Sequence, residues 1–226
     1  MNIRNLLLTT LAMTSLMLTA PSQAASLNLT PAFPDFQLAN DQAISYDATT
    51  GDLTISGGTI AGYTEASGND SWLVTAPESF SLSATFDTGT GDFLSGSFSL
   101  TGIVRDNINP LTIYYDGGTD PDGLLSGSLF EFGWSGTGQN SGIIEFTFNN
   151  GDGIIADLFG VAGGMILTVN TGSSFTGSAT FNNDILAQNW SGSALGDVFV
   201  PIPAALWLFV SGLAGLMGIA RSRKPA

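Results

Sequence analysis

The chain has 226 residues with 19 acidic and 5 basic side chains, and it contains no cysteine and no histidine. The missing residue types exclude thiol and imidazole catalysis, disulfides and the usual zinc and haem sites. Residues 25–199 contain all 19 acids and a single base, Arg105, so their formal charge is −18. A surface with this charge repels phosphate, which excludes a nucleic-acid partner.

The first 24 residues have the pattern of a signal peptide. Arg4 precedes an apolar run from Leu6 to Leu18, and small side chains follow at Ser22 and Ala24. The run is too short for a stable membrane span, and the two small side chains suit signal peptidase. We therefore expect signal peptidase to cut after Ala24, or one residue later after Ala25, and the rest of the chain to be exported.

Residues 25–185 are predicted to form one all-β domain. Apolar and polar residues alternate repeatedly, turns rich in glycine and asparagine separate the runs, and no strong helical period is present. The alternation predicts strands at 43–46, 52–56, 80–86, 93–104, 111–115, 124–134, 142–148 and 165–170. Many short strands at this spacing are typical of an antiparallel β-sandwich or jelly roll.

Two of the predicted turns share a pattern. Segments 46–57 and 86–96 both contain an aromatic residue, an aspartate, a turn, Gly-Asp and the start of an apolar strand. Glycine supplies positive φ in such turns at low cost. The sequence therefore predicts a hairpin that recurs in the domain.

Three aspartates, Asp116, Asp120 and Asp122, lie within seven residues on a glycine-rich loop. Clusters of carboxylate oxygens bind calcium, but the spacing is not that of an EF-hand and no glutamate closes the loop. We expect a solvated turn here, with no cofactor, and keep a calcium site as the alternative.

Aromatic residues offer a possible surface for stacking sugars. The candidates are Trp72, Tyr114, Tyr115, Trp134 and Trp190. In a regular strand one ring of the Tyr114-Tyr115 pair must point outward, so this pair is the preferred carbohydrate candidate. Trp134 lies within an alternating run and is expected in the core.

Four glutamates, Glu65, Glu78, Glu131 and Glu145, are the only ones in the chain. Glu131 and Glu145 both lie in predicted strands, where a facing pair would suit a glycoside hydrolase. Acids in antiparallel strands more often face water on the open side of the sheet. We therefore predict no enzymatic activity.

The last 41 residues are predicted to contain a linker and a tail. Residues 186–199 indicate a tether, and residues 204–220 are an uncharged apolar run just long enough to span a membrane. Arg221, Arg223 and Lys224 follow this run and favour the cytoplasmic side. This topology places the acidic domain outside the inner membrane.

The tail resembles the PEP-CTERM class of bacterial sorting signals, through the motif Val200, Pro201, Ile202, Pro203 and Ala204 followed by the apolar run and the basic end. It is most similar to the VPLPA-CTERM variant, which has leucine where this chain has Ile202. The resemblance implies that an exosortase, a membrane transpeptidase, recognises residues 200–204 and removes the tail. The two prolines hold this motif extended, as a transpeptidase cleft requires.

These features predict an exported protein of the cell envelope or of the extracellular matrix of a biofilm, which acts by its surface. A module that binds extracellular polysaccharide, with or without calcium, is the first alternative. A carboxylate-dependent glycoside hydrolase is the second. Exposed aromatic rings in one concave patch would favour the polysaccharide-binding module, and two facing acids in a deep cleft would favour the hydrolase.

Overall fold

The computed structural model describes residues 25–68, 70–172, 181 and 185–200. These residues form ten strands and one short helix. The elements are β1 (Asp35–Asp47), β2 (Asp52–Ser56), β3 (Ile60–Thr64), β4 (Ser71–Phe86), β5 (Phe93–Arg105), β6 (Ile113–Asp116), β7 (Leu125–Gly136), β8 (Ser141–Asn150), α2 (Ala156–Phe159), β9 (Ala162–Asn170) and β10 (Trp190–Phe199).

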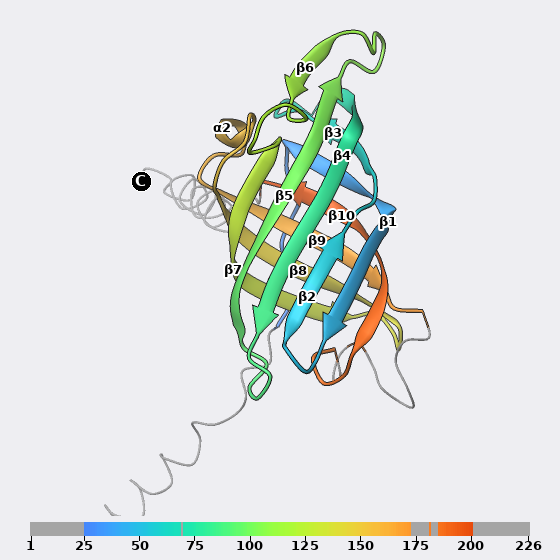
Figure 1. The fold of residues 1–226 in the computed structure, drawn as a ribbon, viewed down its shortest axis with the longest axis vertical. Helices are drawn as coiled ribbons and strands as arrows, with labels where there is room; N and C mark the ends of the chain where they lie inside the picture. The colour runs from blue at the N-terminus through green and yellow to red at the C-terminus, as the bar shows by residue number, and fades with distance from the viewer. Residues whose placement is uncertain (1–24, 69, 173–180, 182–184, 201–226) are drawn as a thin grey trace, which may run out of the picture.

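Eight of the strands close into an antiparallel barrel. Hydrogen-bonded neighbours run β1, β10, β9, β8, β7, β5, β4, β2 and back to β1. β3 lies in the same gap as β2, between β1 and β4, but pairs with the opposite halves of those strands. β6 pairs with the last residues of β5 and projects beyond the barrel with them (Figure 1).

The walls of the barrel cross at a steep angle. In Figure 1, β7, β5, β4, β2 and β1 form the front wall, and β8, β9 and β10 cross behind it. The prediction of an all-β antiparallel fold is confirmed, whereas a β-sandwich is not, because the pairing forms one ring. Alternation predicts strands and not their partners. Here the bulge between Thr75 and Ser79 bends β4, and bends of this kind help a sheet to close.

The interior of the barrel is packed with aromatic side chains. Phe132 contacts Phe86 and Phe146, with ring centroids 4.7 and 5.3 Å apart, and Phe98 contacts Phe148 at 4.5 Å. All five side chains are buried. Edge-to-face and tilted contacts of this kind stabilise the core beyond the burial of their area.

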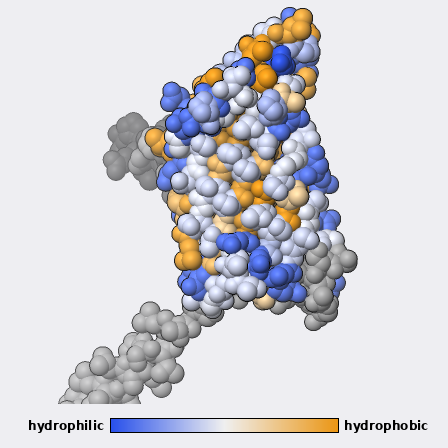
Figure 2. Space-filling view, viewed as in Figure 1, coloured by the Kyte–Doolittle hydropathy of each residue, from blue (hydrophilic) through white to orange (hydrophobic). Residues whose placement is uncertain are grey.

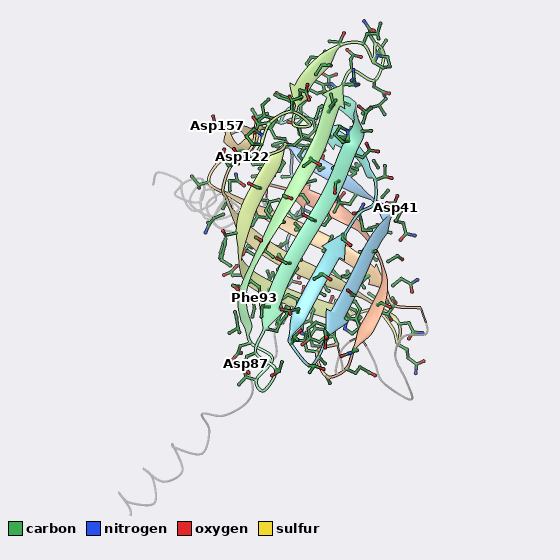
Figure 3. All side chains as sticks on the ribbon, viewed as in Figure 1. Asp41, Asp87, Phe93, Asp122 and Asp157 are labelled. Carbon is green, nitrogen blue, oxygen red and sulfur yellow. The ribbon has the colours of Figure 1, made fainter. Side chains whose placement is uncertain are left out.

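The predicted recurring hairpin is confirmed. Gly51 N donates to Asp47 O and Gly91 N donates to Asp87 O, both at 2.8 Å. The two glycines have φ of 79° and 77°, in the left-handed region that glycine enters without strain. In Figure 3, Asp87 lies at the end of the barrel opposite Asp122.

The predicted linker at 186–199 is wrong for most of its length, and the domain does not end at residue 185. Residues 190–199 form β10, which closes the ring between β1 and β9. Trp190, Ala194 and Val198 point into the core. Their alternation is hidden in the sequence because Gly192 and Gly196 occupy the other inward positions and add no hydropathy.

Other elements are longer than predicted or were missed. β1 begins at Asp35 and β4 at Ser71, because each strand contains an irregularity that interrupts the alternation, at residues 39–41 and at Pro77. Proline is tolerated at such a bulge. β3 was not predicted because a register shift between Ile60 and Gly62 places its buried apolar residues, Ile60 and Tyr63, three positions apart instead of two. α2 was missed because a helix of four residues shows no period.

The expected signal peptide (1–24), the apolar run (204–220) and its basic end lie outside the described residues and stay predictions. Of the sorting motif, Val200 is described, and it packs against the barrel core. Between residues 25 and 200, gaps excepted, the structure has no helix with the length and apolar character that a membrane crossing requires.

Candidate functional site

A cluster of aromatic rings leads from the core to the surface at the end of the barrel that carries β6. Tyr63 on β3 lies opposite Trp72 on β4, and the ring of Trp72 stacks on that of Tyr114 on β6, with centroids 4.0 Å apart and an interplanar angle of 14°. Tyr115 contacts both Trp72 and Tyr63 at 6.2 Å. Three strands therefore hold one continuous aromatic cluster, which runs from the buried Tyr63 to the exposed Tyr114.

A cleft of about 380 Å³ opens beside the stacked pair. A smaller hollow of about 150 Å³ lies next to it and shares Ser71, Trp72 and Asn107 with the cleft. The cleft is lined by Asp70, Ser71, Trp72, Asp106, Asn107, Ile108 and Tyr114. The site therefore combines aromatic rings with carboxylate, amide and hydroxyl groups.

The loop between β5 and β6 forms one wall of the cleft and is held by Asp106. Its Oδ1 accepts hydrogen bonds from the backbone N–H groups of Ile108 (2.6 Å) and Asn109 (2.9 Å), and its Oδ2 accepts one from the Tyr114 hydroxyl (3.2 Å). These bonds, the one from Asn109 first, lower the pKa of Asp106, and the bond to Asp106 raises the pKa of Tyr114. Asp106 therefore stays ionised and fixes the Tyr114 ring.

Arg105 braces the same loop. Its Nε donates to Thr75 Oγ1 on β4 and a terminal guanidinium nitrogen donates to Pro110 O, both at 3.0 Å. The single base of residues 25–199 is thus occupied in holding the loop. It does not line the cleft, which has acidic side chains and no cation among its described lining residues.

The structure brings three of the five candidate aromatic residues together. Tyr114 is 44% exposed and Tyr115 is partly buried, so the prediction that one ring of this pair points outward is confirmed. Trp134 packs against the core as expected, and Trp190 is buried beside Tyr46.

The polar lining of the cleft was missed by the sequence analysis. Asp70 precedes β4, and Asp106 and Asn107 follow β5. An Asp-Asn pair after a strand indicates a turn, but only the pairing of β6 with β5 shows that this turn faces Trp72. The only usable signal was the short spacing between this turn and the tyrosine pair.

The three aspartates of the expected turn do not converge. Asp116 ends β6, with a buried Oδ1 that has no hydrogen-bond partner, whereas Asp120 Oδ1 accepts a bond from Asp122 N at 2.9 Å within the turn. Within the described parts of the chain, no three acidic, histidine or cysteine side chains are grouped to hold a metal. Calcium binding stays a prediction.

Glu131 and Glu145 lie on neighbouring strands but in different surroundings. Glu131 is exposed and accepts a hydrogen bond from Thr147 at 3.0 Å, whereas Glu145 is 3% exposed under residues 26–29. Neither of them lines the cleft at Trp72.

The outer face of the front wall and the adjoining start of β10 carry rows of hydroxyl groups without charge. One row contains six residues in register on six adjacent strands: Ser191, Ser45, Thr54, Ser83, Ser97 and Ser128. A neighbouring row includes Ser81 and Ser99, whose hydroxyls lie 2.9 Å apart. Figure 2 shows this face largely pale, with the strongly hydrophilic residues toward its rim.

No family model, no curated protein and no solved structure matches this chain.

Proposed function

We propose that this protein is exported to the cell envelope or extracellular matrix and binds a neutral polysaccharide in the cleft beside Trp72 and Tyr114. The observation that carries the proposal is the stacked aromatic pair at the edge of a cleft with polar walls. Flat rings match the C–H faces of a pyranose, and the surrounding oxygen and nitrogen atoms supply hydrogen-bond partners for its hydroxyls. We propose no catalytic step.

The charge of the site supports a neutral ligand. Asp70 and Asp106 line the cleft, and residues 25–199 have a formal charge of −18. An anionic polymer would be repelled at low salt, whereas uncharged hydroxyls can donate hydrogen bonds to the carboxylates. Asn107 and Ser71 can donate as well as accept, which suits a ligand with many hydroxyls.

Export is supported by the placement of the barrel in the chain. The strands occupy residues 35–199, between the expected signal peptide and the sorting motif that begins at Val200. We propose that signal peptidase removes the first segment and that an exosortase-type transpeptidase removes the tail, after an inner-membrane intermediate. Both processing steps leave the barrel intact.

The hydroxyl rows favour a second, broader function as a structural protein of the matrix. Serine is an unusual choice for five of six neighbouring strand positions, where charged and β-branched side chains are commoner. An uncharged surface with many donors and acceptors can lie against a hydrated polymer without repulsion. This function needs the barrel face and not the cleft.

Retention of the full chain on immobilised polysaccharides tests the proposal. We expect retention on neutral polymers and none on anionic polymers at low salt. Trp72→Ala should weaken retention about tenfold, because the loss of a stacked aromatic face costs on the order of 1.4 kcal/mol. Phe130→Ala is the matched control, since Phe130 is 46% exposed on β7 and lies outside the cleft. Equal retention of Trp72→Ala and wild type would contradict the proposal.

A further inference from the structure

The carboxylate of Glu145 on β8 is enclosed by the first described residues of the chain. Its Oε2 accepts hydrogen bonds from Ser26 Oγ and Leu27 N, both at 2.6 Å, and from Asn28 N at 3.3 Å. Its Oε1 accepts a bond from Leu29 N at 2.9 Å. Glu145 points away from the barrel core, yet it is only 3% exposed because this segment covers it.

Residues 26–29 are shaped to receive an anion. Three consecutive backbone N–H groups converge on the carboxylate, and Asn28 has a φ of 53°, the one positive φ among the described non-glycine residues. Successive amides that converge in this way form a concave site for a negative charge. The occupant of that site is a side chain of the same protein.

The outer face of the barrel leaves room for the segment. Gly133 on β7 lies directly opposite Glu145, and a Cβ there would be 2.6 Å from Ala25 O and 2.7 Å from Leu27 N. At Gly164 on β9, a Cβ would be 3.3 Å from Leu29 Cδ1. The segment therefore crosses β7, β8 and β9 on a path with little side chain beneath it.

Every donor to Glu145 among the described residues is neutral, although the carboxylate is almost fully buried. A buried carboxylate is stabilised much more when a positive charge lies nearby. Strands β7 to β10 contain no lysine or arginine, and their other acids are Glu131 and Asp197. No side chain of these strands can supply the charge.

We propose that Glu145 is the binding site for the mature N-terminus, so that removal of the signal peptide supplies the missing cation as the α-ammonium group of Ala25. The inference rests on the export proposed above. Leu27 N lies 2.6 Å from the carboxylate, and two residues of chain place the Ala25 nitrogen within about 10 Å of it. Before cleavage that nitrogen is a neutral amide, so processing strengthens the attachment of residues 25–29 to the barrel.

The test compares two forms of the chain that both end at Ala226. One begins at Ala25, and the other has a short uncharged extension before Ala25. Each is prepared with Glu145, with Glu145→Gln and with Glu131→Gln, the matched control on the neighbouring strand. The thermal unfolding midpoint is measured at pH 6.5 and pH 9.5, on either side of the α-amine pKa of about 7.7–8.0.

At pH 6.5, Glu145→Gln should lower the midpoint by several degrees more in the chain that begins at Ala25 than in the extended chain. At pH 9.5 this extra loss should disappear, because the amine is then neutral. Glu131→Gln should shift both chains equally at both pH values. An equal effect of Glu145→Gln in both chains at both pH values would overturn the proposal.

Two further readouts keep the test decisive. If Glu145→Gln does not fold, the two chains with Glu145 are compared directly, and the chain that begins at Ala25 should be the more stable at pH 6.5 only. An exported form that keeps residues before 25 would overturn the proposal. Polysaccharide retention should be unchanged in Glu145→Gln, so failure at this site and failure of the cleft are distinguishable.

Discussion

The rings of Trp72 and Tyr114 are nearly parallel, with centroids 4.0 Å apart, and they join β4 of the barrel wall to the projecting β6. β6 has four residues and pairs only with the end of β5. A strand this short gains little stability from its own ladder. The stack therefore sets the position of β6 and the width of the cleft.

A double-mutant cycle measures this coupling. Trp72→Ala, Tyr114→Ala and the double variant are compared with wild type by denaturant unfolding. We expect an interaction free energy of about 0.5–1.5 kcal/mol, as for other stacked aromatic pairs. Additive single effects would show that the two rings do not stabilise each other.

In the recurring hairpin, the loss of unfolding free energy on replacing a glycine by alanine should be larger where there is less space around that glycine. Gly91→Ala places a side chain in the left-handed region and should cost about 1–2 kcal/mol of unfolding free energy. Gly51→Ala should cost more, because its Cβ would lie 2.0 Å from Phe86 O. Chemical denaturation gives both values, and Gly89→Ala, at a position without positive φ, is the control. The reverse order would contradict this account of the turns.

Gly196→Ala distinguishes a strand from a tether at the end of the domain. A Cβ on Gly196 would lie 2.0 Å from Ile166 O, so the substitution should separate β10 from β9 and lower the unfolding midpoint by many degrees. Leu195→Ala should have a small effect, because Leu195 faces outward and is 40% exposed. Circular dichroism during heating measures both. A neutral Gly196→Ala would restore the linker hypothesis.

Two carboxyls on the outer face of β1 and β10 should make the barrel less stable as pH rises. Burial raises the pKa of Asp35, with a contribution from the charge of Asp197, and burial also raises the pKa of Asp197. A raised folded-state pKa means that the folded protein holds the proton more tightly than the unfolded chain. The free energy of unfolding from these groups therefore falls as pH rises from about 3.9, the unfolded value, through the folded values.

Asp35→Asn removes the ionisation of the more buried group. We expect the variant to gain stability relative to wild type at pH 7 and to lose that advantage near pH 3.5, where Asp35 is protonated anyway. Asp157→Asn, at an exposed position on α2, controls for the change in net charge. Urea unfolding at the two pH values measures the difference. An advantage that is independent of pH would contradict the assignment.

Much of the fold follows from period-two alternation, which is clear where inward positions hold large apolar residues, as at Phe80, Leu82 and Phe86 on β4. It fails where close backbone approach requires glycine, as at Gly196, because the sequence then shows no apolar residue. Ring closure depends on the pairing of β1 with β10, a long-range choice that local pattern does not encode.

The candidate site could be predicted only in part. The outward ring at Tyr114 follows from alternation along a strand, since successive side chains point to opposite faces. Its stacking on Trp72 depends on how β3, β4, β5 and β6 pair, and Asp70 and Asp106 enter the cleft only through that pairing. The covering of Glu145 by residues 26–29 depends on Gly133 in another strand, so no local signal exists for it.

The affinity of the full chain for a neutral oligosaccharide, measured by isothermal titration, tests the central claim most directly. We expect saturable binding that Trp72→Ala weakens about tenfold, equivalent to about 1.4 kcal/mol, while Phe130→Ala leaves it unchanged. An acidic oligosaccharide of the same length should not bind. Absence of saturable binding across a panel of neutral oligosaccharides, or equal affinity in Trp72→Ala and wild type, would contradict the account.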